Sequence, residues 1–126
     1  MLIESWPIDR PRPFERNPRR NDHAVARVAQ SIREFGFRQP IVVDETGEII
    51  CGHTRLKAAE ALGLAEVPVH IARDLTPEQV RAFRIADNRL AELAEWDDAL
   101  LSVELAALEE LGLDLVGHRL VLIAMP

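Results

Sequence analysis

Short apolar segments rich in β-branched residues predict four strands, at residues 2–8, 41–44, 48–51 and 67–71. Prolines at positions 7, 11 and 13 bring the first strand to an end. The second and third strands are separated by a short turn that contains Gly47, which predicts a β-hairpin. These segments are sufficient for one small sheet.

Apolar residues spaced three to four positions apart predict helices between and after these strands. The first helix has Val25, Val28, Ala29, Ile32 and Phe35 on one face. Asn21 or Asp22 is its predicted N-cap, and Gly36 is its left-handed end. A second helix is predicted at about residues 54–62, ending before Gly63.

Two more helices are predicted in the second half of the chain. Thr76, Pro77 and Gln79 form a capping box with proline at the first helical position. This third helix is expected to turn Val80, Phe83 and either Ala86 or Asp87 to one face, and to kink or end near Asn88, because Asp and Asn are poor helix-interior residues. The fourth is capped by Asp97 or Asp98 and ends at Gly112, with four leucines expected to point inward: Leu101, Leu105, Leu108 and Leu111.

The order of these elements predicts an α/β (α+β) domain in which helices surround a small mixed sheet. The chain has 126 residues, enough for one packed core and short for two. We place this domain at residues 1–112. Residues 113–126 have no clear period and are a strand, a docking tail or the truncated start of a continuation.

Composition narrows the class of protein. Cys51 is the single cysteine, which excludes an internal disulfide framework and a cysteine-based zinc cluster and favours a cytoplasmic location. The start lacks the features of a signal peptide, and no segment approaches the roughly 18 apolar residues of a membrane span. No membrane partner is expected.

The net charge of −6 is unevenly distributed. Residues 1–40 have a charge of +3 and residues 41–126 have a charge of −9. Direct DNA binding would therefore depend on the arginines of the N-terminal loop, which equally suit a solubilising role. These are Arg10, Arg12, Arg16, Arg19 and Arg20.

Residues 49–59 carry the chemistry of an anion site. A β-type apolar run ends at Gly52, and a helical segment that contains Thr54, Arg55 and Lys57 begins directly behind it. Free backbone N–H groups, the positive end of the helix dipole and nearby cations would meet at this junction. Phosphate is the anion expected there, although Arg55 could instead pair with a carboxylate such as Glu60 or Glu48.

Four segments in this order resemble the N-terminal domain of the ParB/sulfiredoxin superfamily: residues 36–43, 52–59, 67–69 and 87–90. The similarity runs from about residue 8 to residue 111. The resemblance implies a domain that binds CTP or a related nucleoside triphosphate together with Mg²⁺, hydrolyses it slowly, and closes as a homodimer. It also implies a role in a DNA-partitioning or DNA-modification system. Within the superfamily, the chain most resembles a subgroup that is often linked to DNA methyltransferases.

The same resemblance assigns roles to individual residues. Phosphate contacts fall to Gly52, His53, Thr54, Arg55 and Lys57, where His53, Thr54 and Lys57 stand in place of an acidic residue and two arginines of the ParB pattern. Base and sugar contacts fall to Gln39 and Pro40. Asp87 and Asn88, followed by Arg89, would contact the triphosphate, with Asp87 and Asn88 holding Mg²⁺ and serving catalysis.

Other functions remain open at this point. Sulfiredoxin has its catalytic thiol directly after the junction glycine, where this chain has His53, so Cys51 is predicted to be a buried strand residue. His53 near Asp87 could activate water in a nuclease acting on DNA phosphodiesters. A catalytically silent protein-interaction domain is a third possibility. His23, His70 and His118 lack the spacing of metal ligands.

Overall fold

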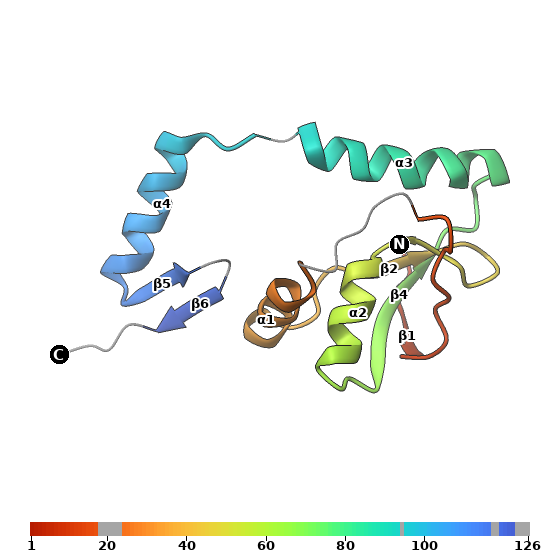
Figure 1. Cartoon of the computed structure of the whole chain (residues 1–126), viewed down its shortest axis with the longest axis horizontal. Helices are drawn as coiled ribbons and strands as arrows, with labels where there is room; N and C mark the ends of the chain where they lie inside the picture. Colours follow the sequence, from red (N-terminus) through yellow and green to blue (C-terminus); the bar gives the residue numbers. More distant parts are fainter. Residues whose placement is uncertain (18–23, 94, 117–118, 123–126) are drawn as a thin grey trace.

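The computed structural model describes residues 1–17, 24–93, 95–116 and 119–122 (Figure 1). Six residues named above lie outside these ranges, namely the predicted caps, two of the arginines and two of the histidines: Asn21, Asp22, Arg19, Arg20, His23 and His118. Part of the 113–126 segment also lies outside them. Among the described residues, no helix has the length and apolar character needed to span a membrane.

The predicted small mixed sheet is present and contains all four expected strands. They are β1 (Glu4–Pro7), β2 (Ile41–Val43), β3 (Ile49–Cys51) and β4 (Glu66–Ile71). Their order across the sheet is β1-β4-β2-β3. Strand β4 runs antiparallel to β1 and parallel to β2, while β2 and β3 form the predicted antiparallel hairpin.

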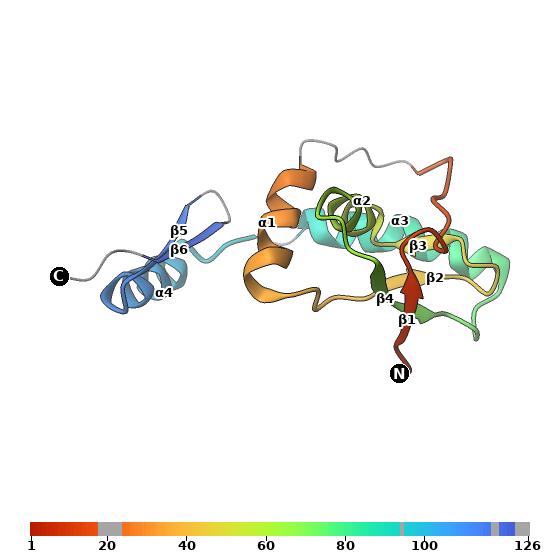
Figure 2. The same cartoon turned by 90° about the horizontal axis from the view of Figure 1, so that it is seen from below.

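Two hydrophobic clusters position the helices against this sheet. The larger one joins β-strand residues to Leu56 and Ala59 of α2 (His53–Ala61), with Ile41, Val43 and Ile49 fully buried. Helix α1 (Val25–Phe35) packs beside α2 (Figure 2). The smaller cluster places Val80 of α3 against Ile50 and Cys51 of β3. The expected α+β class is therefore confirmed.

Helix α3 (Pro77–Leu93) is longer than the sequence predicted. It begins at the predicted capping box, in which the Thr76 N–H donates to Gln79 Oε1 and the Gln79 N–H donates to Thr76 Oγ1. The helix end expected near Asn88 was wrong, because α3 continues to Leu93, and the Asn88 side chain donates to the carbonyl of Arg84 one turn earlier. A kink at this position stays a prediction. The buried face was also misjudged: Arg84 is buried, whereas Phe83 and Asp87 are exposed.

Helix α4 (Asp98–Glu110) is capped by Asp97, which accepts a hydrogen bond from the Leu100 N–H. The prediction that four leucines of this helix point inward was wrong. Helix α4, which is described in full, has no buried residue, and Leu105 and Leu111 are exposed. The helix lies to one side of the four-stranded sheet, so the core does not reach it (Figures 1 and 2). After α4 in the sequence, β5 (Leu113–Val116) and β6 (Arg119–Leu122) form an antiparallel pair, with β6 close to α1.

The turn from β3 into α2 leads to a first prediction. Gly52 has a φ of 108°, and an added Cβ would lie 3.2 Å from Ile41 Cγ1 and 3.3 Å from Ile41 Cα. Gly52→Ala is expected to lower the free energy of unfolding by about 2–4 kcal/mol, because left-handed strain adds to a clash with backbone. Urea unfolding followed by circular dichroism measures the loss.

Gly63→Ala is the matched control. Gly63 has a φ of 72° but would meet no atom within 4 Å, so this substitution introduces strain alone and should cost about 1 kcal/mol. Equal losses at the two glycines would contradict the close packing assigned to Gly52.

Candidate functional site

A cavity of about 520 Å³ opens between α1, the loop that follows it, the start of α2, and α3. Eight of the ten residues assigned to the site from the sequence line it: Gln39, Gly52, His53, Thr54, Arg55, Lys57, Asp87 and Asn88. Three segments that are distant in the sequence, around Gln39, Gly52 and Asp87, thus meet at one place.

The start of α2 forms the polar end of this cavity. Gly52 is the N-cap, and no described side chain caps the helix or adds an acidic charge to its first turn. The first-turn N–H groups and the helix dipole therefore favour an anion here. Thr54 and Lys57, both on this stretch of helix, line the same cavity. The junction has the chemistry of a phosphate site.

Arg55 ties α2 to the loop that precedes β2. Its Nη1 donates to the Gln39 carbonyl at 3.0 Å and to the Pro40 carbonyl at 2.7 Å. Burial lowers the pKa of this guanidinium, although the nearby Asp87 charge opposes the effect. Neither expected carboxylate partner is observed for Arg55 among the described contacts, since Glu48 pairs with Arg84 instead. Arg55 thus shapes the loop as well as contributing charge.

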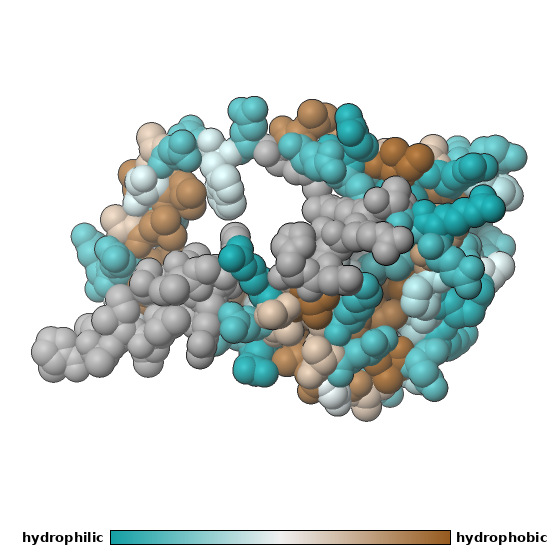
Figure 3. All heavy atoms as spheres, viewed as in Figure 1, coloured by the Kyte–Doolittle hydropathy of each residue, from teal (hydrophilic) through white to brown (hydrophobic). Residues whose placement is uncertain are grey.

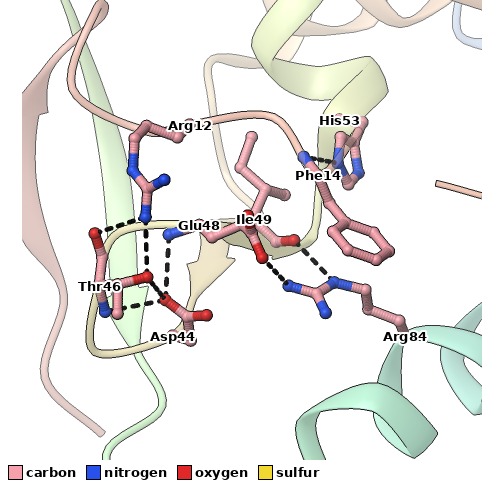
Figure 4. Close-up of polar contacts among 8 residues, drawn as sticks. All are labelled: Arg12, Phe14, Asp44, Thr46, Glu48, Ile49, His53 and Arg84. Atoms are coloured by element: carbon pink, nitrogen blue, oxygen red, sulfur yellow. Dashed lines mark hydrogen bonds and ion pairs between the residues drawn. The ribbon is translucent and has the colours of Figure 1, made fainter. Parts of the chain in front are cut away.

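His53 accepts a hydrogen bond, whereas the sequence suggested that it could act as a general base. The Phe14 N–H donates to His53 Nε2 at 3.0 Å (Figure 4). Burial, aided by the positive charges of Arg84 and Lys57, lowers the pKa of His53 to about 4. The imidazole is neutral at pH 7, and its Nε2 is engaged by the N-terminal segment. His53 therefore holds that segment beside the phosphate end and brings no charge to it.

Arg84 is a buried charged residue next to this site that sequence reasoning missed, although it is not part of the described cavity lining. It is buried on α3, where its Nε donates to the Ile49 carbonyl at 3.0 Å and its Nη2 lies 3.2 Å from Glu48 Oε1. Its guanidinium also covers the ring of Phe14, 3.8 Å from the ring centre (Figure 4). The signal in the sequence was its position four residues after Val80 and four before Asn88, on the inner face of α3.

Asp87 and Asn88 lie across the cavity from the start of α2, near Cys51. Burial and the adjacent Asp87 carboxylate raise the pKa of the Cys51 thiol to about 12. The thiol is therefore protonated at pH 7, and Cys51 is buried on β3 as predicted. This removes the basis for a sulfiredoxin-type nucleophile. Asp87 and Asn88 supply a carboxylate and an amide oxygen, which suit a hard cation.

Two of the assigned residues lie elsewhere. Pro40 is not part of the described cavity lining, and its carbonyl accepts a hydrogen bond from Arg55. Arg89 is exposed on α3, 3.7 Å from Glu92, and it too is absent from that lining. The structure does not bring Arg89 together with the other site residues, because it lies one position beyond Asn88, on the outer face of the helix.

The described N-terminal arginines make contacts of their own. The Arg12 guanidinium donates to the carbonyl and the hydroxyl oxygen of Thr46, and that of Arg10 lies 3.9 Å from the centre of the Trp6 ring. Arg16 is exposed. Arg10 and Arg12 thus secure the N-terminal loop to the sheet.

The family model for the ParB N-terminal domain matches residues 3–94 of this chain. A ParB-like nuclease domain-containing protein, YnaK of Escherichia coli, is 42% identical over 74 residues, covering 58% of this chain and 85% of YnaK. These similarities agree with the superfamily assignment made from the sequence.

Solved structures agree in the fold. The C-terminally truncated chromosome-partitioning protein ParB from Caulobacter crescentus, complexed with CTP-γ-S, superposes with a TM-score of 0.73 at 27% identity. The match covers 87% of this chain and 64% of the ParB chain. Sulfiredoxin from Arabidopsis thaliana matches with a TM-score of 0.54 at 29% identity, over 66% of this chain and 97% of sulfiredoxin.

The geometry of His53 predicts a pH dependence of stability. The pKa of His53 is about 4 in the folded protein and about 6.5 in the unfolded chain, so the unfolded chain takes up this proton at a higher pH. The free energy of unfolding should therefore fall as the pH decreases through this window, by an amount on the order of 1 kcal/mol because the ring is partly exposed.

His53→Gln is the comparison variant, since the Gln amide oxygen can accept from Phe14 and does not titrate. Urea unfolding at several values between pH 7 and pH 4 should show that wild type loses stability relative to the variant as the pH falls. Parallel profiles would overturn the assignment of His53 as a neutral acceptor.

Proposed function

The chain belongs to the ParB N-terminal domain family, and on this premise we propose that it is a nucleotide-binding module that takes CTP or a related nucleoside triphosphate. The observation that supports this most directly is the cavity itself, because it joins an uncapped helix N-terminus to the loop before β2. We further propose that the module serves a DNA-partitioning or DNA-modification system.

In this proposal, the phosphates lie at the start of α2. The backbone from Gly52 to Thr54, the Thr54 hydroxyl and the Lys57 ammonium provide their contacts. The base and sugar lie along the loop that contains Gln39, whose course is fixed by the two bonds from Arg55 to backbone carbonyls. The ParB structure with CTP-γ-S, which shares this fold, supports the placement of a nucleotide.

Asp87 and Asn88 fit a magnesium ion that arrives with the nucleotide. Mg²⁺ commonly uses one or two protein oxygens together with phosphate oxygens and water, and these two residues supply such a pair beside the cavity. A bound Mg²⁺ would neutralise phosphate charge and polarise the terminal phosphoryl group. Slow hydrolysis is part of the proposal, with Asp87 and Asn88 positioning the cation.

The nuclease alternative has less support in the structure, although YnaK has nuclease in its name. The Nε2 atom of His53 is engaged by Phe14, so it is poorly placed to activate water. Within the described ranges, no group of three or more His, Cys, Asp or Glu residues could hold a metal ion. Metal-dependent nucleases rely on such groups.

Contact with DNA is proposed to be indirect or to use the N-terminal arginines. A ParB structure of the same fold is complexed to the centromeric parS site, which supports DNA as the partner in this proposal. The acidic segment from residue 91 to residue 114 would be repelled by phosphate, which leaves the opposite end of the chain for such a contact. A DNA methyltransferase partner remains a prediction from the sequence resemblance.

A thermal-shift panel tests the proposed nucleotide site. CTP with Mg²⁺ is expected to raise the melting temperature, since a site filled at a hundredfold excess over Kd stabilises a fold by about 2.7 kcal/mol. UTP, ATP and GTP establish the base preference. If no nucleotide shifts the melting of folded protein, a silent interaction domain becomes the better description.

Lys57→Gln and Arg89→Gln form a matched pair for this assay. Each removes one positive charge from an exposed side chain, but only Lys57 lines the cavity. The apparent affinity derived from the nucleotide-induced shift in melting temperature should fall at least about tenfold for Lys57→Gln and hardly change for Arg89→Gln. The reverse order would restore Arg89 to the site and remove Lys57.

We also propose that nucleotide binding promotes a homodimer through α4. Leu100 and Val103 are 65% and 64% exposed, and apolar side chains are visible on the face of this helix that is turned to the viewer in Figure 3. Leu100→Ser combined with Val103→Ser should weaken dimerisation at least about tenfold while keeping the nucleotide-induced thermal shift.

Sedimentation velocity with and without CTP and Mg²⁺ measures this effect. Ala106→Ser, a similar change at another exposed position of α4, is the control. A wild-type protein that remains monomeric with nucleotide bound would refute the dimer and leave the nucleotide site standing.

A further inference from the structure

The apolar face of α1 lines the cavity and contributes little to the core. Val28, Ile32 and Phe35, spaced by four and then three residues, all line the cavity. Within α1, which is described in full, only Ala29 is buried. An amphipathic helix normally covers its apolar stripe with other parts of the protein. Here that stripe faces a space large enough for a small molecule.

The two ends of this cavity differ in chemistry. Val28, Ile32 and Phe35 provide an apolar wall at α1, whereas the other end has the N–H groups of α2 and the Lys57 ammonium. A ligand complementary to both ends has an apolar, planar part joined to an anionic part. Inorganic phosphates and sugar phosphates satisfy only the polar end.

We propose that Phe35 forms a stacking platform for the base of the bound nucleotide, an inference that rests on the proposed function. Its side chain is 45% exposed although it belongs to the apolar stripe, so a ring surface is available at the cavity. Phe37, two residues later, instead packs against the hydrophobic core. Phe37 lines the same cavity but is half-buried against the core, so of these two aromatic rings Phe35 exposes the larger surface.

The backbone around Phe35 is held in place before any ligand arrives. The Gly36 N–H donates to the Ile32 carbonyl at 2.7 Å, and Arg38 Nε donates to the Phe35 carbonyl at 2.7 Å. Gly36 has a φ of 84°, and a Cβ there would lie 3.3 Å from Arg38 Nε, so glycine permits this arrangement. A platform fixed in this way loses little conformational entropy on binding.

Stacking contributes affinity for any base, because every base has a π-face. Choice among bases then falls to polar groups at the same end of the cavity. The Gln39 amide, which lines the cavity beside Arg38, offers both a donor and an acceptor to a base edge. Phe35 therefore selects for nucleotides over bare polyphosphates, and Gln39 is placed to refine the choice.

Phe35→Leu tests this platform, because leucine keeps an apolar side chain and removes the ring. Isothermal titration calorimetry should give about a tenfold or greater loss of affinity for CTP with Mg²⁺ and an unchanged affinity for inorganic tripolyphosphate with Mg²⁺. Phe35→Trp should restore CTP binding. Circular dichroism melting without ligand checks that each variant is folded.

Phe83→Leu is the matched control, since Phe83 is a partly exposed aromatic residue on α3 that is not part of the described cavity lining. It should bind both ligands as wild type does. Equal losses for CTP and tripolyphosphate in Phe35→Leu, or no loss for either, would overturn the stacking role. A wild-type protein that binds tripolyphosphate as tightly as CTP would also overturn it. If wild type binds neither ligand, the proposed function itself fails.

Discussion

The close contact between Gly52 and Ile41 is the constraint on which the site depends. A Cβ at position 52 would press against Ile41 of β2, and the left-handed φ lets β3 turn directly into α2. Because Ile41 is also part of the buried core, the position of the helix N-terminus is set by the packing of the sheet. The uncapped helix end at the cavity is thus positioned by the core and does not require a flexible loop.

A second set of interactions joins three distant segments around this turn. Arg84 on α3 holds the backbone of β3 at Ile49 and covers the ring of Phe14, whose N–H donates to His53 at the start of α2 (Figure 4). The charge of Arg84 also helps to keep His53 neutral, which that hydrogen bond requires. An arginine, a phenylalanine and a histidine therefore join α3, the N-terminal segment and the start of α2 beside the cavity.

The successes and errors of prediction follow the range of the interactions involved. The capping box at Thr76, the cap at Asp97 and the hairpin around Gly47 were all predictable, because each depends on residues only a few positions apart. The helix end expected at Asn88 was wrong because α3 continues to Leu93, with the Asn88 side chain bonded to a carbonyl one turn back. The inward leucines of α4 were wrong because a periodic pattern shows which residues share a face and does not show what covers that face.

The sequence by itself determined the α+β class, the strand-to-helix junction at Gly52 and most of the residues that meet in the cavity, since these follow from local propensity and from a family pattern with conspicuous glycines. Only the tertiary structure decided that the stripe ending at Phe35 lines a cavity, that Arg84 is buried, and that Arg89 faces away. The physical reason is that burial and cavity walls arise between segments far apart in the chain. The charge and hydropathy of a residue do not specify its distant neighbours.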